Sequence, residues 1–415
     1  MKHTQIRSIA IVNPLGDYGI SGYTFELAEA LGVNGVQVDT YVSGSSSDDF
    51  PPPMYHRRLP VLGTALIKQR DILSSSRAKK TVEDRRKPKH RSLRTRLECS
   101  AMYCRLRNAF LRLELPLYLK AKGYDVVWTQ WPEMSDYGSG FWRICKLLGM
   151  HVVHTVHNVL PHEESILDRA NCGKVYMAAE KLFVHSDWSR KELLRIFPAL
   201  DGRVALMRHG LFSIYDRKAG ARQDLRKRLG IADDQVALLF CGAIRPYKNI
   251  DSVITALKDK RCRNVVLVVS GEESSYSPAS ASEPLSRTRR LAEKEGVLDR
   301  IKLLPGFLKR VEMAELFEAG DAVVLPYVRG YGSGMLLLGM AFEKHILSTE
   351  TGGAEEYLKS YGRYTLLRGT AGADVAQGIC EFLEEGQVEM PVDTSELAWS
   401  KIARQALENL NETFR

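Results

Sequence analysis

The stretch VALLFCGAIRPYKNIDSVITALK, residues 236–258, predicts the fold class. Its first six residues are apolar and β-prone, which is typical of a buried strand. Gly242 follows, and a short basic turn leads into Ile250–Lys258, where apolar residues recur at helical spacing. A strand, a tight turn and a helix in succession are the repeating unit of a parallel α/β sheet covered by helices on both faces.

The same succession recurs along the chain. Ser8–Asn13 predicts a first strand, and a glycine-rich turn over 16–22 leads to a helix over Tyr23–Leu31. Further strands are predicted at Val36–Val42, Asp125–Thr129, Val152–Val156, Lys181–His185, Val204–Met207, Val265–Ser270, Ile301–Leu304, Ala322–Leu325 and His345–Ser348. The pattern pauses at the polar residues Gly210–Asp234. We therefore expect two doubly wound α/β domains, over 1–210 and 211–392.

A helix is also predicted at Lys401–Asn411, within a C-terminal segment over 393–415. Whether this helix packs back on the N-terminal domain is left open. The loop over Glu273–Glu283 is rich in Ser and Pro and predicts no regular structure.

The composition limits the classes of protein. The chain has 415 residues, of which 44% are apolar and 26% charged, and this suits a water-soluble globular protein with more than one core. It has no run of about 18 apolar residues and begins with polar residues, so neither a membrane-spanning helix nor a secretory signal is expected. Seven scattered cysteines without a C-x-x-C pair predict reduced thiols in a cytoplasm, with no disulfide framework and no zinc site.

The positive charge is concentrated in one segment. The net charge of the chain is +9, and residues 68–96 alone hold twelve Lys and Arg against three Asp and Glu. Leu97–Leu117 follows, with apolar residues at near-helical spacing and arginines between them. Residues 68–117 therefore predict either contact with anionic lipid on the inner face of a membrane or a solvated loop before a core helix. Nucleic acid is the weaker expectation, because no base-reading motif accompanies the charge.

Histidines follow three predicted strands of the first domain. His157 comes directly after Val152–Val156, and His185 and His209 end two later strands. Open parallel sheets bind ligands at the carboxyl ends of their strands, so His157 is a candidate catalytic residue, although a lone histidine is also compatible with a structural role. No two of them have the i, i+4 spacing of a helical metal site, so no metal is expected.

Small residues and cations follow the strands of the second domain. Gly242 permits a tight turn, and Arg245 and Lys248 flank the start of the next helix. Cations and a helix N-terminus together are what a diphosphate needs, and a solvated surface pair is the alternative.

Two later turns of the second domain add further candidates. The Ser333 hydroxyl and the N–H groups of Gly334 and Met335 open an apolar helix and suit phosphate oxygens. Glu356 follows Gly352–Gly353, and its carboxylate would either accept hydroxyls of a sugar or ribose or cap a helix.

With these motifs the chain resembles the family 4 glycosyltransferases, whose GT-B fold has two Rossmann-like domains facing across a cleft. The motifs are the loop 16–22, TVHN at 155–158, HS at 185–186, HG at 209–210, GAIRPYKNI at 242–250, PYVRGYGSGMLLLGMAF at 326–342 and TGGAEEYL at 351–358. The resemblance covers about 7–390. It implies transfer of a hexose from a nucleotide diphosphate sugar to a glycan or lipid-linked acceptor, as in bacterial exopolysaccharide synthesis, without a cofactor.

The resemblance also implies roles for single residues. Lys248 and Arg245 would hold the diphosphate with Ser333 and Gly334, His157 would lie near the donor sugar, and Glu356 near the nucleotide. The acceptor would bind to the N-terminal domain, where Asp17, Gly19, Gly22 and Glu163 are the candidate residues.

One departure from the family affects the stereochemistry. The family often carries two glutamates eight positions apart, and Tyr331 and Gly339 stand at those positions here. If the transfer retains the anomeric configuration, the leaving phosphate itself takes the acceptor proton. If the transfer inverts it, a base is required, for which Asp17 or Glu163 are the candidates. The alternative function is a protein of this fold that binds membrane or nucleic acid through its basic segment without turnover.

Overall fold

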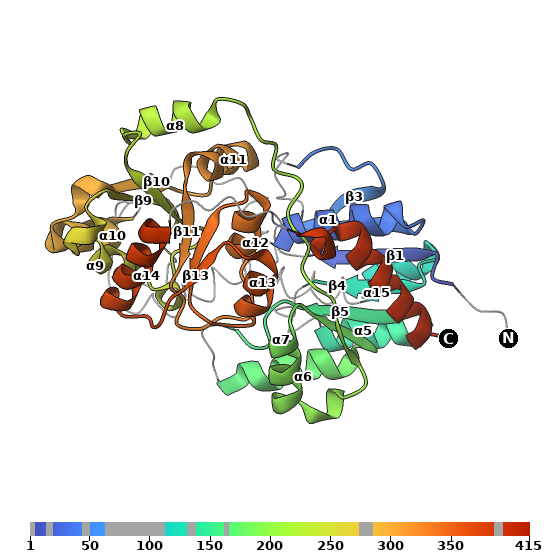
Figure 1. Ribbon diagram of the computed structural model, residues 1–415. Coiled ribbons are helices and arrows are strands. Elements are labelled where there is room, and N and C mark those ends of the chain that lie inside the picture. Colours follow the sequence, from blue (N-terminus) through green and yellow to red (C-terminus); the bar gives the residue numbers. More distant parts are fainter. Residues whose placement is uncertain are drawn as a thin grey trace, which may run out of the picture. The chain divides into compact units, whose positions relative to one another are not determined.

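The computed structural model describes residues 5–13, 20–43, 50–62, 113–130, 138–161, 166–273, 285–385 and 393–415. They fall into two compact units, each built on one parallel sheet (Figure 1). The N-terminal unit comprises Met1–His185, Arg190–Met207 and Trp399–Arg415, and the C-terminal unit comprises Ser186–Ser189 and Arg208–Ala398. The predicted class, two doubly wound α/β domains, is confirmed.

The sheet of the N-terminal unit has seven strands in the order β3-β2-β1-β4-β5-β6-β7. The strands are β1 (Ser8–Asn13), β2 (Gln37–Ser43), β3 (His56–Leu62), β4 (Val126–Thr129), β5 (His151–Val156), β6 (Lys181–Val184) and β7 (Val204–Leu206). The helices are α1 (Ile20–Val33), α5 (Gly138–Leu147), α6 (Ile166–Ala178), α7 (Asp187–Ile196) and α15 (Trp399–Thr413). The strand order reverses between β1 and β4, and such a switch point opens a crevice at the carboxyl edge of a sheet.

The sheet of the C-terminal unit has six strands in the order β10-β9-β8-β11-β12-β13. The strands are β8 (Val236–Cys241), β9 (Val265–Gly271), β10 (Ile301–Pro305), β11 (Ala322–Leu325), β12 (His345–Ser348) and β13 (Tyr364–Leu366). The helices are α8 (Ala221–Leu229), α9 (Ile250–Ala256), α10 (Ser286–Glu295), α11 (Arg310–Ala319), α12 (Gly334–Ala341), α13 (Ala354–Tyr361) and α14 (Gly372–Glu385). Its switch point lies between β8 and β11.

Burial on both faces explains why β8 is apolar throughout. Leu238 and Phe240 pack with residues of α9, α10 and α14 in one core. Ala237, Leu239 and Cys241 point to the other face and pack with residues of α8, α11, α12 and α13. Alternate side chains of a strand reach opposite faces, so a strand between two helical layers has no polar side.

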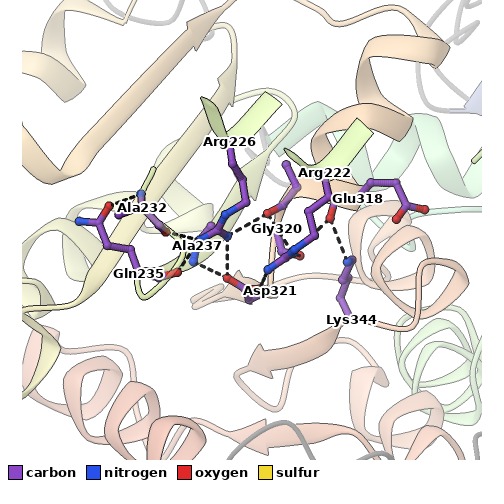
Figure 2. Close-up of polar contacts among 10 residues, drawn as sticks. Arg222, Arg226, Ala232, Gln235, Ala237, Glu318, Gly320, Asp321 and Lys344 are labelled. Carbon is purple, nitrogen blue, oxygen red and sulfur yellow. Dashed lines mark hydrogen bonds and ion pairs between the residues drawn. The ribbon is translucent and has the colours of Figure 1, made fainter. Parts of the chain in front are cut away.

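An ion network anchors α8 to the sheet of the C-terminal unit (Figure 2). The carboxylate of Asp321 accepts hydrogen bonds from Arg222 at 2.6 Å, from Arg226 at 3.1 Å and from the Ala237 N–H at 2.7 Å. Burial would raise the pKa of Asp321, but these donors outweigh it and hold that pKa below its usual range. Arg226 also donates to the carbonyl oxygens of Ala232 and Gln235, so α8 is fixed by its charged face.

The core of the N-terminal unit contains residues from both ends of the chain. Trp399, Ile402 and Ala406 of α15 are buried in the cluster that also holds Ile9 and Leu27. The Asn411 side chain accepts a hydrogen bond from the Ile6 N–H at 3.0 Å, and the Asn34 side chain donates to the Ser400 carbonyl. Helix α15 therefore packs on α1 as part of this unit.

The strands predicted from the sequence are present within one or two residues of their predicted bounds. Two strands are additional, β3 and β13, and helix α8 lies where the strand–helix pattern was expected to pause. β3 was not predicted because it is an edge strand with two arginines and a proline, and β13 because it has only three residues. Helix α8 was not predicted because most of its residues are polar or charged. The segment 68–96 and residues 274–284 of the predicted loop lie outside the described residues.

Candidate active site

The carboxyl edge of the C-terminal sheet brings Gly242, Lys248 and Met335 together. Gly242 follows β8 with a φ of 90°, in the left-handed region that favours glycine. A Cβ atom at position 242 would lie 3.1 Å from Nζ of Lys248 and 4.0 Å from Cγ of Met335. Glycine thus leaves space in front of the ammonium group that any side chain would occupy.

Lys248 is a buried cation. It lies in the short 3₁₀ turn η2 (Pro246–Lys248), is 8% exposed, and donates from Nζ to the Cys241 carbonyl at 3.4 Å. Burial is the main cause that lowers the pKa of Lys248 to about 8, and the nearby charge of Arg245 lowers it further. An anion at this point would restore the charged form and be bound by it.

The turn that carries Lys248 is fastened to the end of the neighbouring strand β11. Asn249 adopts a φ of 57° and donates from its side chain to the carbonyl oxygens of Pro326 at 3.3 Å and Thr370 at 2.8 Å. The Val328 N–H donates to the Tyr247 carbonyl at 2.8 Å. These bonds fix the ammonium relative to the β11–α12 segment.

Ser333 begins α12 as its N-cap. Its Oγ accepts a hydrogen bond from the Leu336 N–H at 3.3 Å. Nζ of Lys248 lies 5.7 Å from the centre of the Tyr327 ring. Gly334 and Met335 therefore present the first N–H groups of a helix next to a cation, the combination expected from the sequence.

The positions of the two missing glutamates have different environments. A Cβ atom at Gly339 would lie 2.5 Å from Cδ1 of Ile346 and 3.1 Å from Cγ2 of Val323, so α12 lies too close to the sheet for a larger residue. Tyr331 has its ring centre 5.8 Å from that of Trp188, and its carbonyl accepts from the Ser189 hydroxyl. No carboxylate replaces either glutamate at these two positions.

Glu356 has a capping role in the structure. Its two carboxylate oxygens accept hydrogen bonds from the backbone N–H groups of Asp187 at 2.9 Å and Trp188 at 2.8 Å, the first residues of α7. Ser186–Ser189 group with the C-terminal unit, and the guanidinium of Arg208 lies 3.9 Å from the same carboxylate. The sequence left hydroxyl binding and capping open, and this geometry is capping.

The carboxyl edge of the N-terminal sheet carries a chain of hydrogen bonds. Nδ1 of His185 lies 3.0 Å from the Met207 carbonyl, and Nε2 of His185 lies 3.1 Å from Nδ1 of His157. Nε2 of His157 lies 3.1 Å from Oε1 of Gln130. These side chains follow β4, β5 and β6, three adjacent strands, and the chain ends at Met207 after β7.

Tyr23 of α1 packs against this chain. Its ring centre lies 4.7 Å from that of His157 and 5.2 Å from that of His185, and Trp399 lies 5.1 Å away behind it. Gly22 precedes Tyr23 inside α1, not in the predicted loop, because the helix starts at Ile20.

Each sheet brings one group of the predicted residues together at its own carboxyl edge. His209 belongs to the C-terminal unit, where its backbone N–H donates to the Tyr357 hydroxyl. Of the three histidines, His157 and His185 therefore take part in the hydrogen-bond chain and His209 does not. Asp17, Gly19 and Glu163 lie outside the described residues. Sequence reasoning missed Gln130, Tyr23 and Asn249; for Gln130 the signal was its place directly after a predicted strand.

Comparison with known families shows what the chain is similar to. Residues 221–402 match the family model described as "Glycosyl transferases group 1". The chain is 27% identical over 283 residues to D-inositol 3-phosphate glycosyltransferase 2 of Catenulispora acidiphila, covering 63% of either protein. It is 26% identical over 220 residues to the Mycobacterium ulcerans D-inositol 3-phosphate glycosyltransferase, covering 50% of this chain and 45% of that protein. The aligned region thus spans less than two thirds of these relatives.

Solved structures share the fold along nearly the whole chain. The sucrose-phosphate synthase of Thermosynechococcus elongatus matches with a TM-score of 0.64 at 17% identity, covering 99% of this chain and 95% of that one. Anabaena Alr3699/HepE in complex with UDP matches with a TM-score of 0.62 at 15% identity, covering 99% and 98%. The two sheets found here are thus those of the GT-B fold. Within the described residues, no helix is long and apolar enough to cross a bilayer.

Proposed function

Because residues 221–402 match the family model of the group 1 glycosyltransferases and the chain has the GT-B fold, we propose that it belongs to this family and transfers a sugar from a nucleotide diphosphate sugar to an acceptor hydroxyl. One observation carries this proposal: Lys248 keeps a buried ammonium group beside the open face of Gly242 and the start of α12. Burying a cation costs free energy unless an anion compensates it. A diphosphate is the anion that fits a cation, a glycine turn and a helix N-terminus together.

The reaction follows from where charge develops. The bond between the anomeric carbon and the diphosphate oxygen breaks, and its electron pair stays on the diphosphate. Lys248, Arg245 and the N–H groups of Gly334 and Met335 stabilise this growing negative charge, with the Ser333 hydroxyl nearby. The acceptor oxygen then bonds to the anomeric carbon and gives up its proton.

We place the donor sugar near His157, as the family resemblance implies, and we propose a retaining transfer of a hexose. Position 339 has no room for a carboxylate, so the family's second glutamate takes no part here. In the retaining reaction the leaving diphosphate oxygen accepts the proton of the acceptor, and no protein base is needed. The anomeric configuration of the product, read by NMR, tests this; inversion would direct attention to Asp17 and Glu163.

The acceptor is proposed to be a glycan or lipid-linked saccharide. The relatives are named for inositol phosphate, and one structural neighbour is a trehalose-phosphate synthase in complex with glucose-6-phosphate. None of these names refers to exopolysaccharide. Sugar phosphates and inositol phosphate therefore belong in the same acceptor panel as undecaprenyl-linked saccharides.

A surface of the N-terminal unit favours a membrane as a second partner. Leu113, Leu117 and Tyr118 are 58%, 54% and 42% exposed on one helical stretch, which is separated from the basic segment 68–96 in the sequence by residues 97–112. Exposed apolar side chains beside basic residues are typical of contact with anionic lipid. The wild type should sediment with phosphatidylglycerol vesicles, and the variant in which Leu113 and Leu117 are both changed to Ser should stay in the supernatant. The membrane proposal would be contradicted if the wild type and the variant bound equally, or if the wild type bound phosphatidylcholine vesicles as well as phosphatidylglycerol vesicles.

Binding of the donor tests the main proposal. Nucleotide sugars with UDP, GDP, ADP and dTDP are compared by thermal shift, because a specific ligand raises the melting temperature by mass action. One donor class should stabilise the wild type and should fail to stabilise Gly242→Ala, whose Cβ enters the space before Lys248. Lys260→Ala removes an exposed cation from the same unit and is the matched control. If no nucleotide sugar binds, or if Gly242→Ala binds it as well as the wild type does, the site is wrongly assigned.

A further inference from the structure

The hydrogen-bond chain at the N-terminal edge has a fixed direction. The Met207 carbonyl only accepts hydrogen bonds, so Nδ1 of His185 is the protonated nitrogen of that ring. Burial lowers the pKa of His185 to about 4, so the ring is neutral at physiological pH and its Nε2 is an acceptor. The proton between the two rings therefore belongs to Nδ1 of His157.

This direction determines what the far side of His157 offers. A neutral ring that is protonated at Nδ1 has a lone pair at Nε2, and that atom lies 3.1 Å from the Gln130 amide. With the amide oxygen facing His157, the fully buried Nε2 of Gln130 has no hydrogen-bond partner among the residues that the structure describes. Turned by 180°, the amide donates to His157 instead, and the two amide orientations are interchangeable by shape.

We propose that His185 is a positioning residue that holds His157 in its Nδ1-protonated form, with Nε2 as the hydrogen-bond acceptor of the site. Tyr23 supports this arrangement, because its ring packs on both imidazoles. That lone pair matches a ligand hydroxyl, which can donate to it in place of the Gln130 amide N–H. It does not match a carbonyl or a phosphate oxygen, which only accept. The part of this inference that concerns a sugar hydroxyl rests on the proposed function.

Two substitutions separate positioning from packing. Gln at position 185 can donate to the Met207 carbonyl and accept from Nδ1 of His157, as the histidine does. Met has a similar bulk and no N–H donor. We expect His185→Met to lower kcat/KM for sugar transfer about ten- to a hundredfold, the usual effect of losing a group that orients a site residue. His185→Gln should stay close to the wild type, and the affinity for UDP, which has no sugar, should be unchanged in both variants.

A spectroscopic measurement tests the proton positions without activity. Protein labelled with ¹⁵N in histidine is compared in long-range ¹H–¹⁵N spectra with the His157→Gln and His185→Gln variants, which identify the two signals. Both rings should be neutral and protonated at Nδ1 near pH 7, and His157 should lose this tautomer in His185→Met. A ring of His157 protonated at Nε2 in the wild type would overturn the inference, as would full transfer activity of His185→Met.

The two proposals fail in different ways. If the wild type shows the expected tautomers but transfers no sugar from any donor, the proposed function is wrong and the positioning by His185 stands. If the wild type transfers sugar and the tautomers are reversed, the function stands and the role given to His185 is wrong.

Discussion

The two sheets share one strand order, to which the N-terminal sheet adds a seventh strand, but they present different chemistry at their carboxyl edges. The N-terminal edge ends in neutral side chains, His157, His185 and Gln130, which are joined by directed hydrogen bonds. The C-terminal edge ends in the buried ammonium of Lys248, a glycine turn and the first N–H groups of α12. One edge suits hydroxyl groups and the other suits an anion, although both come from the same strand–turn–helix unit. The fold supplies the position of a site, and the residues after each strand decide its ligand.

The largest effect is expected when the cation of the C-terminal edge, Lys248, is removed. Lys248→Ala should lower kcat/KM for transfer about 10²- to 10³-fold, because an oriented charge that stabilises the leaving diphosphate is lost. Steady-state kinetics with the preferred donor measure this, and Lys260→Ala is the control. A loss below tenfold would show that the anion does not depend on Lys248.

The neutral edge is tested by His157→Ala. This substitution should lower transfer about ten- to a hundredfold, within the usual range for one positioned group. Affinity for UDP should not change, because the proposed contact of His157 is with the sugar and not with the diphosphate. Titration calorimetry with UDP and with the nucleotide sugar gives both values. Weaker UDP binding in His157→Ala would contradict the proposal that His157 contacts the sugar and not the diphosphate.

The two edges should also differ in their response to pH. Since burial holds the pKa of Lys248 at about 8, the free protein binds a diphosphate best below pH 8, where the ammonium is charged. Above that pH the dissociation constant for UDP should rise about tenfold per pH unit, until the higher pKa of the bound form is reached. Lys248→Arg stays charged and should flatten this dependence. A flat profile for the wild type would mean that Lys248 does not exchange its proton on binding.

The smallest expected effect concerns the cap of α12. Ser333→Ala should cost about 1 kcal/mol of unfolding free energy, because the Leu336 N–H loses its acceptor. Ser333→Asp keeps a capping oxygen but adds negative charge where the diphosphate is proposed to bind. It should therefore retain the wild-type melting temperature and weaken UDP binding. If Ser333→Asp binds UDP as tightly as the wild type, the start of α12 is not part of the anion site.

The sequence predicted strands best where burial makes them uniform. VALLFC was identifiable because both of its faces are covered, whereas β3 combines charged residues and a proline at a sheet edge. Helix α8 was missed because most of its residues are polar or charged and part of what holds it is ionic: Arg222 and Arg226 bind Asp321, which is 99 and 95 residues away from them in sequence. Periodicity does not report an ion pair of that kind.

The candidate site was predictable to the level of residues but not of bonds. The positions of His157, Lys248 and Ser333 at strand ends follow from the pattern of strands and turns. The link from His185 to His157 and the capping by Glu356 depend on which atoms meet across separate strands and helices. Such contacts depend on three-dimensional packing, which cannot be read from the pattern of a single sequence in that detail.

The return of α15 to the N-terminal unit has a consequence for synthesis on the ribosome. The seven-stranded sheet lacks part of its covering layer until Trp399–Thr413 emerge, and by then the whole of Arg208–Ala398 has been translated. The unit that begins first is thus completed last, and the C-terminal unit can mature ahead of it. A premature stop codon just before residue 399 would destabilise the N-terminal unit, because Ile9 and Leu27 would lose their packing contacts with α15.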